Sequence, residues 1–171
     1  GYSKNGFILK VMMLLDKISC KCSRLVIVPG SDLAERMRIR FKNHCPKTLV
    51  INNWVDDEKI YPLPADHKEV RAFKEKYGLN DKFTIMYSGN IGLYYDLENL
   101  IKVIGEFSNR EDVIFAFVGD GTEKNKLQMY VESRNIENIV FIPYQLREEL
   151  IYSLNAADVH WCINAKGIKG V

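Results

Sequence analysis

Cysteine is scarce in this chain. Four cysteines occur among 171 residues, at positions 20, 22, 45 and 162. This number is too small for the disulfide scaffold of a secreted protein, so we expect reduced thiols and a cytoplasmic protein. Cys20 and Cys22, taken with His44 and Cys45, do not form the paired knuckles of structural zinc sites. The sequence therefore gives a metal site little support.

Long apolar runs are also absent. No unbroken run approaches the roughly 18 residues that a membrane-spanning helix needs, and no signal peptide is recognisable. Apolar residues nevertheless make up 47% of the chain, which is too many for a disordered protein. The length suits one domain, or one domain and part of another.

Acidic residues are rare in the first 50 positions, which hold ten lysines and arginines against three acids. The remaining residues hold fourteen basic side chains against nineteen acidic ones. This asymmetry indicates two differently employed regions, and the absence of a basic stripe from the second argues against nucleic-acid binding. The basic region suits an anionic membrane surface. The three scattered histidines do not suggest a catalytic triad.

The first region predicts two helices and two short strands. Residues 7–19 (FILKVMMLLDKIS) have apolar side chains around most of the helical circumference, so we expect a well-buried helix. Residues 24–28 predict a buried strand that ends in the Pro29-Gly30 turn. Ser31 can cap a helix over 32–43, and residues 48–51 predict a second strand.

Residues 52–64 (NNWVDDEKIYPLP) lack periodicity and predict a crossing between domains. After them, apolar strands alternate with helices. The expected strands are 83–88, 113–118, 138–142 and 158–163, and the expected helices are 66–77, 96–107, 122–134 and 147–155. The strands are continuous apolar runs, which is typical of strands buried on both faces. The sequence therefore predicts an α/β fold, with a Rossmann-like parallel sheet and helices on both faces.

Ligands of such sheets bind at the carboxyl ends of the strands, and three strand ends are unusual here. Ser88 is followed by Gly89-Asn90-Ile91-Gly92, a loop whose glycines let the backbone approach a diphosphate ahead of a helix beginning near Asp96. The alternative is that these glycines only turn a tight loop.

The second strand end is Gly119-Asp120-Gly121. A dinucleotide fingerprint requires a third glycine where Lys124 stands, so a nicotinamide motif fails here. The third is Pro143-Tyr144-Gln145, where Tyr144 can flank a base. Taken alone, each of these two loops is more simply explained as a turn.

The order of these segments resembles family 4 glycosyltransferases with the GT-B fold, closest to the branch that builds bacterial O-antigen, capsule and colanic acid. The resemblance covers about residues 24–171. The segments that carry it are the crossing at 52–56 (NNWVD), the first donor-site loop at 87–92 (YSGNIG), the VGDG at 118–121, and the FIPY at 141–144 with Leu150 and the AADV at 156–159.

The resemblance implies a donor site. In it, the residues facing the donor diphosphate would be Gly89, Asn90 and Gly92, those lining the nucleotide cleft Gly119, Asp120 and Gly121, and those beside the base Pro143 and Tyr144. Many members have arginine where Asn90 stands and lysine where Tyr95 stands, and those cations neutralise the leaving diphosphate. No catalytic residue can be assigned.

The resemblance also implies a division of the chain. Residues 1–51 would be the tail of an N-terminal, acceptor-side domain, 52–64 the crossing, and 65–171 a nucleotide-sugar-binding domain cut short at its end. The family's acceptor-side glycine loop and its E-x7-E region are missing, so we expect this chain alone to be inactive.

The implied activity is transfer of a sugar from a UDP- or GDP-sugar to a growing, lipid-linked bacterial surface glycan. We expect this transfer to retain the configuration of the sugar and to need neither a metal nor a cofactor. We also expect the protein to contact the inner face of the plasma membrane peripherally. Two alternatives stay open, which are a GT-B sugar-nucleotide epimerase and a non-catalytic, flavodoxin-like nucleotide- or protein-binding module.

Overall fold

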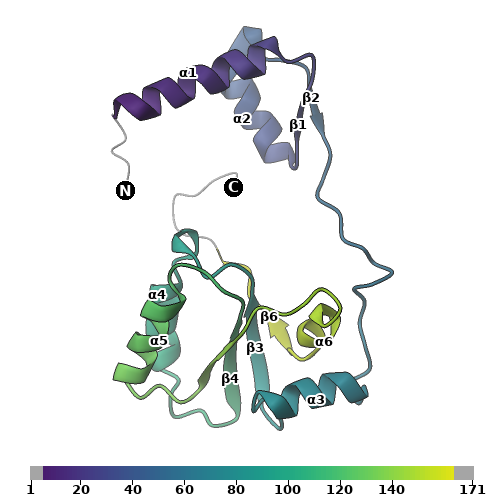
Figure 1. The fold of residues 1–171 in the computed structure, drawn as a ribbon, viewed down its shortest axis with the longest axis vertical. Helices are drawn as coiled ribbons and strands as arrows, with labels where there is room; N and C mark the ends of the chain where they lie inside the picture. Colours follow the sequence, from purple (N-terminus) through teal and green to yellow (C-terminus); the bar gives the residue numbers. More distant parts are fainter. Residues whose placement is uncertain (1–5, 164–171) are drawn as a thin grey trace. The chain divides into compact units, whose positions relative to one another are not determined.

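The computed structural model describes residues 6–163, while residues 1–5 and 164–171 are not described. The start of the predicted N-terminal domain and the end of the predicted nucleotide-sugar-binding domain therefore lie outside the described residues. The chain forms two compact units, which divide between Val55 and Asp56. Each unit is described by itself below (Figure 1).

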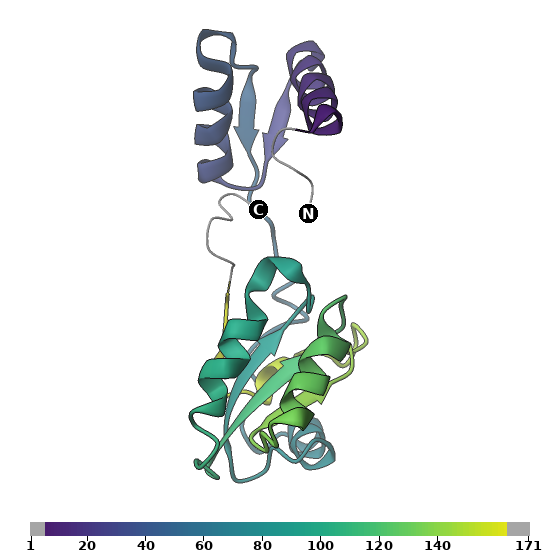
Figure 2. The same ribbon diagram turned by 90° about the vertical axis from the view of Figure 1, so that its left-hand side faces the viewer.

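The first unit is a parallel pair of short strands with two helices. Its elements are α1 (Phe7–Cys22), β1 (Val26–Val28), α2 (Ser31–Phe41), the 3-10 turn η1 (Lys42–His44) and β2 (Thr48–Val50). The strands pair from Val26 opposite Thr48 to Val28 opposite Val50. Helix α2 packs along this pair, as Figure 2 shows. An ion pair from Asp16 to Arg40 joins α1 to α2.

The prediction that residues 7–19 form a well-buried helix is right about the helix and wrong about its burial. No residue of α1 is buried in the described structure. Its apolar side chains surround the helix, whereas a neighbouring helix and two three-residue strands can cover only a small part of that surface. The exposed apolar side chains are Phe7, Ile8, Val11, Met12, Met13, Leu14, Leu15 and Ile18.

Two smaller predictions for this unit are also wrong. Ile27, in the middle of β1, is exposed, so only Val28 of that strand is buried. Ser31 is the first residue of α2 rather than its cap, because Gly30 occupies the N-cap position in an extended conformation. No side chain caps that helix end by a hydrogen bond.

The second unit contains a four-stranded parallel sheet, as the sequence predicts, and its strand order is β5-β4-β3-β6. Its strands are β3 (Phe83–Ser88), β4 (Val113–Val118), β5 (Ile139–Ile142) and β6 (Val159–His160). Strand β6 is shorter than the predicted 158–163. It pairs on one side only, with Ile85 and Met86 of β3, which limits the length of the ladder.

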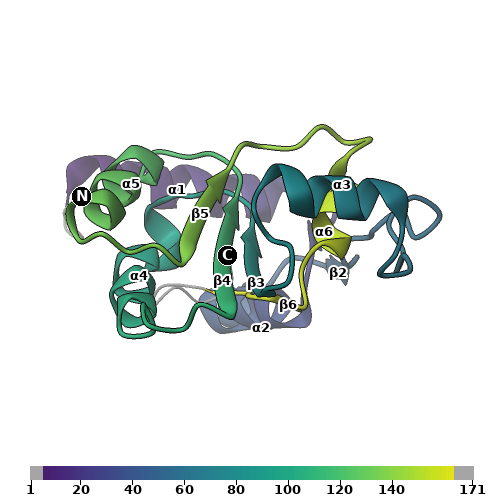
Figure 3. The same ribbon diagram turned by 90° about the horizontal axis from the view of Figure 1, so that it is seen from below.

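Helices cover both faces of this sheet, with α4 (Leu97–Gly105) and α5 (Lys124–Ser133) on one face and α3 (Lys68–Lys76) and α6 (Leu150–Asn155) on the other, as Figure 3 shows. Each helix is somewhat shorter than the range predicted for it. Side chains of β4 alternate between the two faces, so Phe115 and Phe117 pack under α4 and α5, whereas Ile114 and Ala116 pack under α3 and α6. These two clusters hold the strands in fixed register.

Part of the predicted crossing is attached to the second unit. The Asn155 side chain accepts a hydrogen bond from the Leu63 amide (2.8 Å) and donates one to the Tyr61 carbonyl (3.0 Å). Asn155 thereby fixes this segment against α6. Within residues 6–163, no helix combines the length and the apolar character that crossing a membrane requires.

Candidate functional site

Strands β3, β4 and β5 end side by side. Ser88, Val118 and Ile142 are register partners across the sheet. Because the strands are parallel, residues 89–92, 119–121 and 143–145 leave the sheet at the same edge. The structure therefore brings the three predicted loops together, as the sequence requires for a shared site.

Backbone hydrogen bonds join the first two loops beyond the strands. The amides of Gly89 and Ile91 donate to the carbonyls of Val118 (2.9 Å) and Asp120 (2.8 Å). The Gly119 amide donates to the Ile142 carbonyl at 3.1 Å, which connects the third strand end. The loops thus continue the hydrogen-bond ladder of the sheet beyond the strand ends.

The close approach of the loops explains two of the predicted glycines. A Cβ atom on Gly119, whose φ is +141°, would lie 2.0 Å from the Gly89 carbonyl oxygen. A Cβ atom on Gly121 would lie 2.3 Å from the Ile91 carbonyl oxygen. Gly89 differs, because its Cβ would meet only the Tyr87 side chain, at 3.5 Å. Packing between loops therefore requires glycine at 119 and 121. At Gly89 the constraint is the backbone conformation, since its φ of +159° disfavours an L side chain.

Asn90 lies exposed among these glycines. Its side-chain nitrogen is 2.9 Å from where a Cβ of Gly92 would be, and its side-chain oxygen 2.7 Å from the same point on Gly121. The Tyr87 hydroxyl donates to the Asn90 carbonyl at 2.8 Å. Burial, followed by the neighbouring Tyr95 and Cys162, raises the pKa of Tyr87 to about 12. Tyr87 thus stays a protonated donor and holds the loop.

The helix behind the first loop begins close to the predicted Asp96. The 3-10 turn η2 (Leu93–Tyr95) separates Gly92 from α4, which begins at Leu97. Asp96 occupies the N-cap in a left-handed conformation, and its carboxylate accepts a hydrogen bond from Asn99 at 2.8 Å. A carboxylate therefore already stands at the helix end that was expected to face a diphosphate.

Lys124 is the residue that the sequence analysis missed. It begins α5, and its ammonium donates to the Gly119 carbonyl at 2.9 Å. In the sequence it was considered only as the residue that breaks a dinucleotide fingerprint. Nothing in the linear pattern indicates that its side chain turns back to the glycine loop.

The remaining predicted residues have plain local roles. Asp120 is exposed, and its carboxylate accepts the Gly121 amide at 2.7 Å. In the third loop, the buried Gln145 side chain donates to the Pro143 carbonyl at 2.6 Å. Tyr144 is 75% exposed, so its ring is available to a ligand.

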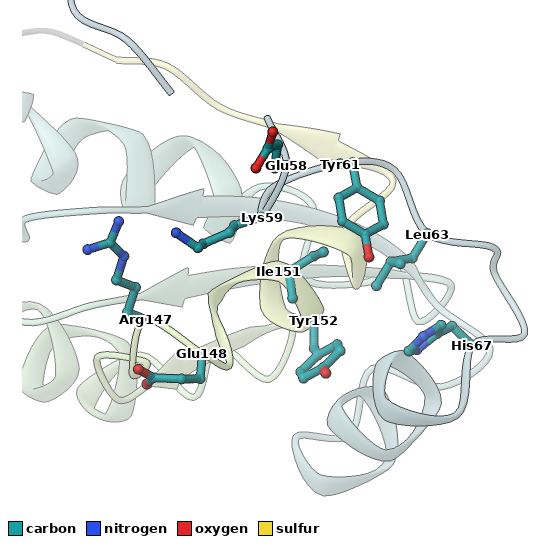
Figure 4. Close-up of a pocket in the computed structure, with 9 residues that line it drawn as sticks. All are labelled: Glu58, Lys59, Tyr61, Leu63, His67, Arg147, Glu148, Ile151 and Tyr152. Carbon is teal, nitrogen blue, oxygen red and sulfur yellow. The ribbon is translucent and has the colours of Figure 1, made fainter. Parts of the chain in front are cut away.

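A pocket of about 490 Å³ lies between the crossing segment and α6 (Figure 4). None of the predicted site residues lines it. The cations Lys59 and Arg147 lie 2.6 Å and 3.9 Å from the Asp56 carboxylate, and Glu58 and Glu148 also line the pocket. Both cations are therefore already paired with a carboxylate.

The zinc arrangement weighed from the sequence does not form in the described part of the chain. The thiols of Cys20, Cys22 and Cys45 are free. Among residues 6–163, no three histidine, cysteine, aspartate or glutamate side chains gather as a metal site requires.

Comparison with known proteins gives consistent matches. The model of the family described as glycosyl transferases group 1 matches residues 69–163. Escherichia coli WcaI, named as a colanic acid biosynthesis glycosyl transferase, is 35% identical over 116 residues, or 67% of this chain and 28% of its own length. The alpha-D-kanosaminyltransferase of Streptomyces kanamyceticus is 30% identical over 53% of this chain and 24% of its own length.

A solved structure shares the fold. Anabaena HepE, in complex with UDP and glucose, matches with a TM-score of 0.69 and 16% identity, over 92% of this chain and 42% of HepE. The chain spans about a quarter of the length of the two curated relatives described above.

Proposed function

The chain belongs to the glycosyl transferases group 1 family, of the GT-B type, and from this membership we propose that it binds the nucleotide-sugar donor of a glycosyltransferase. The observation that carries the proposal is the register that aligns Ser88, Val118 and Ile142. It gives three loops one common edge, and all three lie within the matched residues 69–163.

The roles proposed for the loops are those that the family resemblance implies. We assign Gly89, Asn90 and Gly92 to the donor diphosphate. The position of the Asn90 side-chain amide, between the first and second loops, supports this assignment. The nucleotide cleft is lined by Gly119, Asp120 and Gly121, and the base lies by Pro143 and Tyr144. The exposed Tyr144 ring supports that last role, since aromatic rings offer a stacking face to a base.

Sugar transfer itself is proposed for a longer protein, because this chain spans only about a quarter of the relatives described above. In that protein, residues 1–51 belong to the acceptor-side domain, 52–64 to the crossing and 65–171 to the donor domain. The transfer retains configuration and needs no metal. Positioning and stabilisation of the leaving diphosphate supply its rate.

The donor is a UDP- or GDP-sugar, and the acceptor is a lipid-linked glycan of a bacterial surface polysaccharide. The likeness to WcaI supports the acceptor class, and the likeness to HepE with bound UDP supports the donor class. The basic first 50 residues support peripheral contact with an anionic membrane surface on its cytoplasmic side.

Calorimetric titration of the chain with UDP and GDP tests this proposal. We expect saturable binding of one of them at roughly millimolar concentration or below. Gly89→Ala should weaken it by about 1–3 kcal/mol, the range for lost hydrogen bonds to a charged group. The new methyl group narrows the backbone approach, and the φ of +159° at this position disfavours an L side chain. Absence of saturable binding by the wild type to either nucleotide refutes the proposal. Unchanged affinity in Gly89→Ala makes this loop only a turn.

A further inference from the structure

The three loops at the sheet edge contain no basic residue. Their sequences are SGNIG at 88–92, GDG at 119–121 and PYQ at 143–145, with Asp120 as the one charged side chain. A nucleoside diphosphate carries several negative charges, so a site made of these loops alone gives it no counter-charge. Positive charge for a diphosphate must therefore come from outside these loops.

We propose that the Lys124 ammonium supplies this positive charge and binds the diphosphate of the donor. The inference rests on the proposed function and names the residue that supplies its charge. Lys124 is half-buried, and its Nζ atom lies 2.9 Å from the Gly119 carbonyl oxygen. Gly119 is itself packed against Gly89. The ammonium is therefore anchored at the junction of the first two loops, with further N–H donors for phosphate oxygens.

The pairing of the nearby cations separates Lys124 from its neighbours. Lys102 and Lys126 both bind the Glu98 carboxylate, at 3.0 Å and 2.7 Å, and Lys126 also lies 3.6 Å from Glu123. Among the described residues, no ion pair joins Lys124 to a carboxylate, and its partner is a neutral carbonyl. Its charge is therefore uncompensated.

The position of Lys124 in α5 adds to this imbalance. It is the first residue of the helix. The first turn holds no acidic side chain, and the acidic N-cap residue, Glu123, lies 3.6 Å from Lys126 rather than pairing with Lys124. A helix N-terminus carries partial positive charge, so a lysine there adds to the positive charge at that end. A diphosphate between the loops offsets both positive charges at once. Arg147, near the third loop, is not an equivalent candidate, because it faces Asp56 at 3.9 Å.

The experiment compares Lys124→Met with Lys126→Met in the full 171-residue chain. Both changes remove a lysine from the same helix, but only Lys124 contacts the glycine loops. The readouts are calorimetric affinities for UDP, GDP and the corresponding nucleosides, with melting temperatures alongside. Lys124→Met should lose roughly ten- to a hundred-fold in affinity for the nucleoside diphosphate, as expected when a charged hydrogen bond is removed. Nucleoside affinity should stay constant, and Lys124→Arg should retain most of the binding.

The outcomes separate the two proposals. If the wild type binds a nucleoside diphosphate and Lys124→Met binds it as tightly as Lys126→Met does, the assignment of Lys124 is wrong and the proposed function stands. Equal loss of nucleoside and diphosphate affinity in Lys124→Met also overturns the assignment, because the effect is then structural. If the wild type binds neither UDP nor GDP, the proposed function itself fails.

Discussion

The two units of this chain use the same parallel strand-helix connection but bury very different amounts of apolar surface. In the second unit, four adjacent strands present apolar side chains on two faces, and helices cover both. In the first, two three-residue strands and α2 leave α1 without a buried residue. The apolar content of a helix therefore does not decide its burial. The burial of a helix depends instead on the extent of the surface that it packs against.

The largest expected difference between the units concerns core side chains. Phe117 is 1% exposed and Leu15 is 61% exposed. Phe117→Ala should lower the free energy of unfolding of the second unit by about 3–5 kcal/mol, through lost burial and a residual cavity. Leu15→Ala should change it by less than about 0.5 kcal/mol.

Urea denaturation followed by tryptophan fluorescence measures both variants. Trp161 lies against Phe115, with ring centroids 5.3 Å apart, and reports the second unit, whereas Trp54 is already exposed. Far-UV circular dichroism follows α1. If Phe117→Ala does not fold, Phe117→Leu gives a smaller loss in the same direction. If Leu15→Ala lowered the free energy of unfolding as much as Phe117→Ala, α1 would be covered in solution, and the difference in burial between the two units would be wrong.

A second difference lies in the glycines that follow the strands. Alanine at Gly119 puts Cβ 2.0 Å from a backbone oxygen at a φ of +141°, so a strand end must move. We expect Gly119→Ala to cost about 3 kcal/mol. Gly30 follows β1 in the first unit, and there a Cβ meets only the flexible carboxylate of Asp32. Gly30→Ala should cost less than about 0.5 kcal/mol. Urea midpoints measure both, and equal costs would contradict the close contact between the loops.

These contrasts mark what the sequence can reveal. Continuous apolar runs predicted the parallel sheet of the second unit, because a strand such as 113–118 needs cover on both faces. The same reasoning failed for 7–19, since periodicity reports the shape of an apolar surface and not the presence of a partner for it. The length of β6 was also missed, because it depends on a ladder with one neighbouring strand.

The candidate site was predictable to a similar degree. Glycines after strands indicated the first two loops, and parallel topology predicted that all three share an edge. The spacing could not distinguish Gly119, which a neighbouring carbonyl requires, from Gly89, where a Cβ has room and only the φ of +159° favours glycine. Lys124 was missed because a long side chain that turns back five residues to a carbonyl leaves no periodic signal.

The smallest expected effect concerns surface ion pairs in the two units. Hydrogen bonds from Lys126 and Lys102 lower the pKa of Glu98, in the first turn of α4, to about 2 from an ordinary 4.5. Because the folded-state pKa is the lower one, this carboxylate stabilises the second unit above pH 4.5, and the contribution is lost as pH falls towards 2. Exposed pairs are screened by water and salt, so the effect should be small.

Urea midpoints of Glu98→Gln and the wild type should differ slightly at pH 7 in low salt, and converge both in acid and in high salt. Asp16→Asn, which removes the α1–α2 ion pair of the first unit, is the matched control and should leave the Trp161 transition unchanged at every pH. If the difference between Glu98→Gln and the wild type persists at pH 2, the cause is packing rather than charge, and the contact between α4 and α5 is then apolar in its energetics.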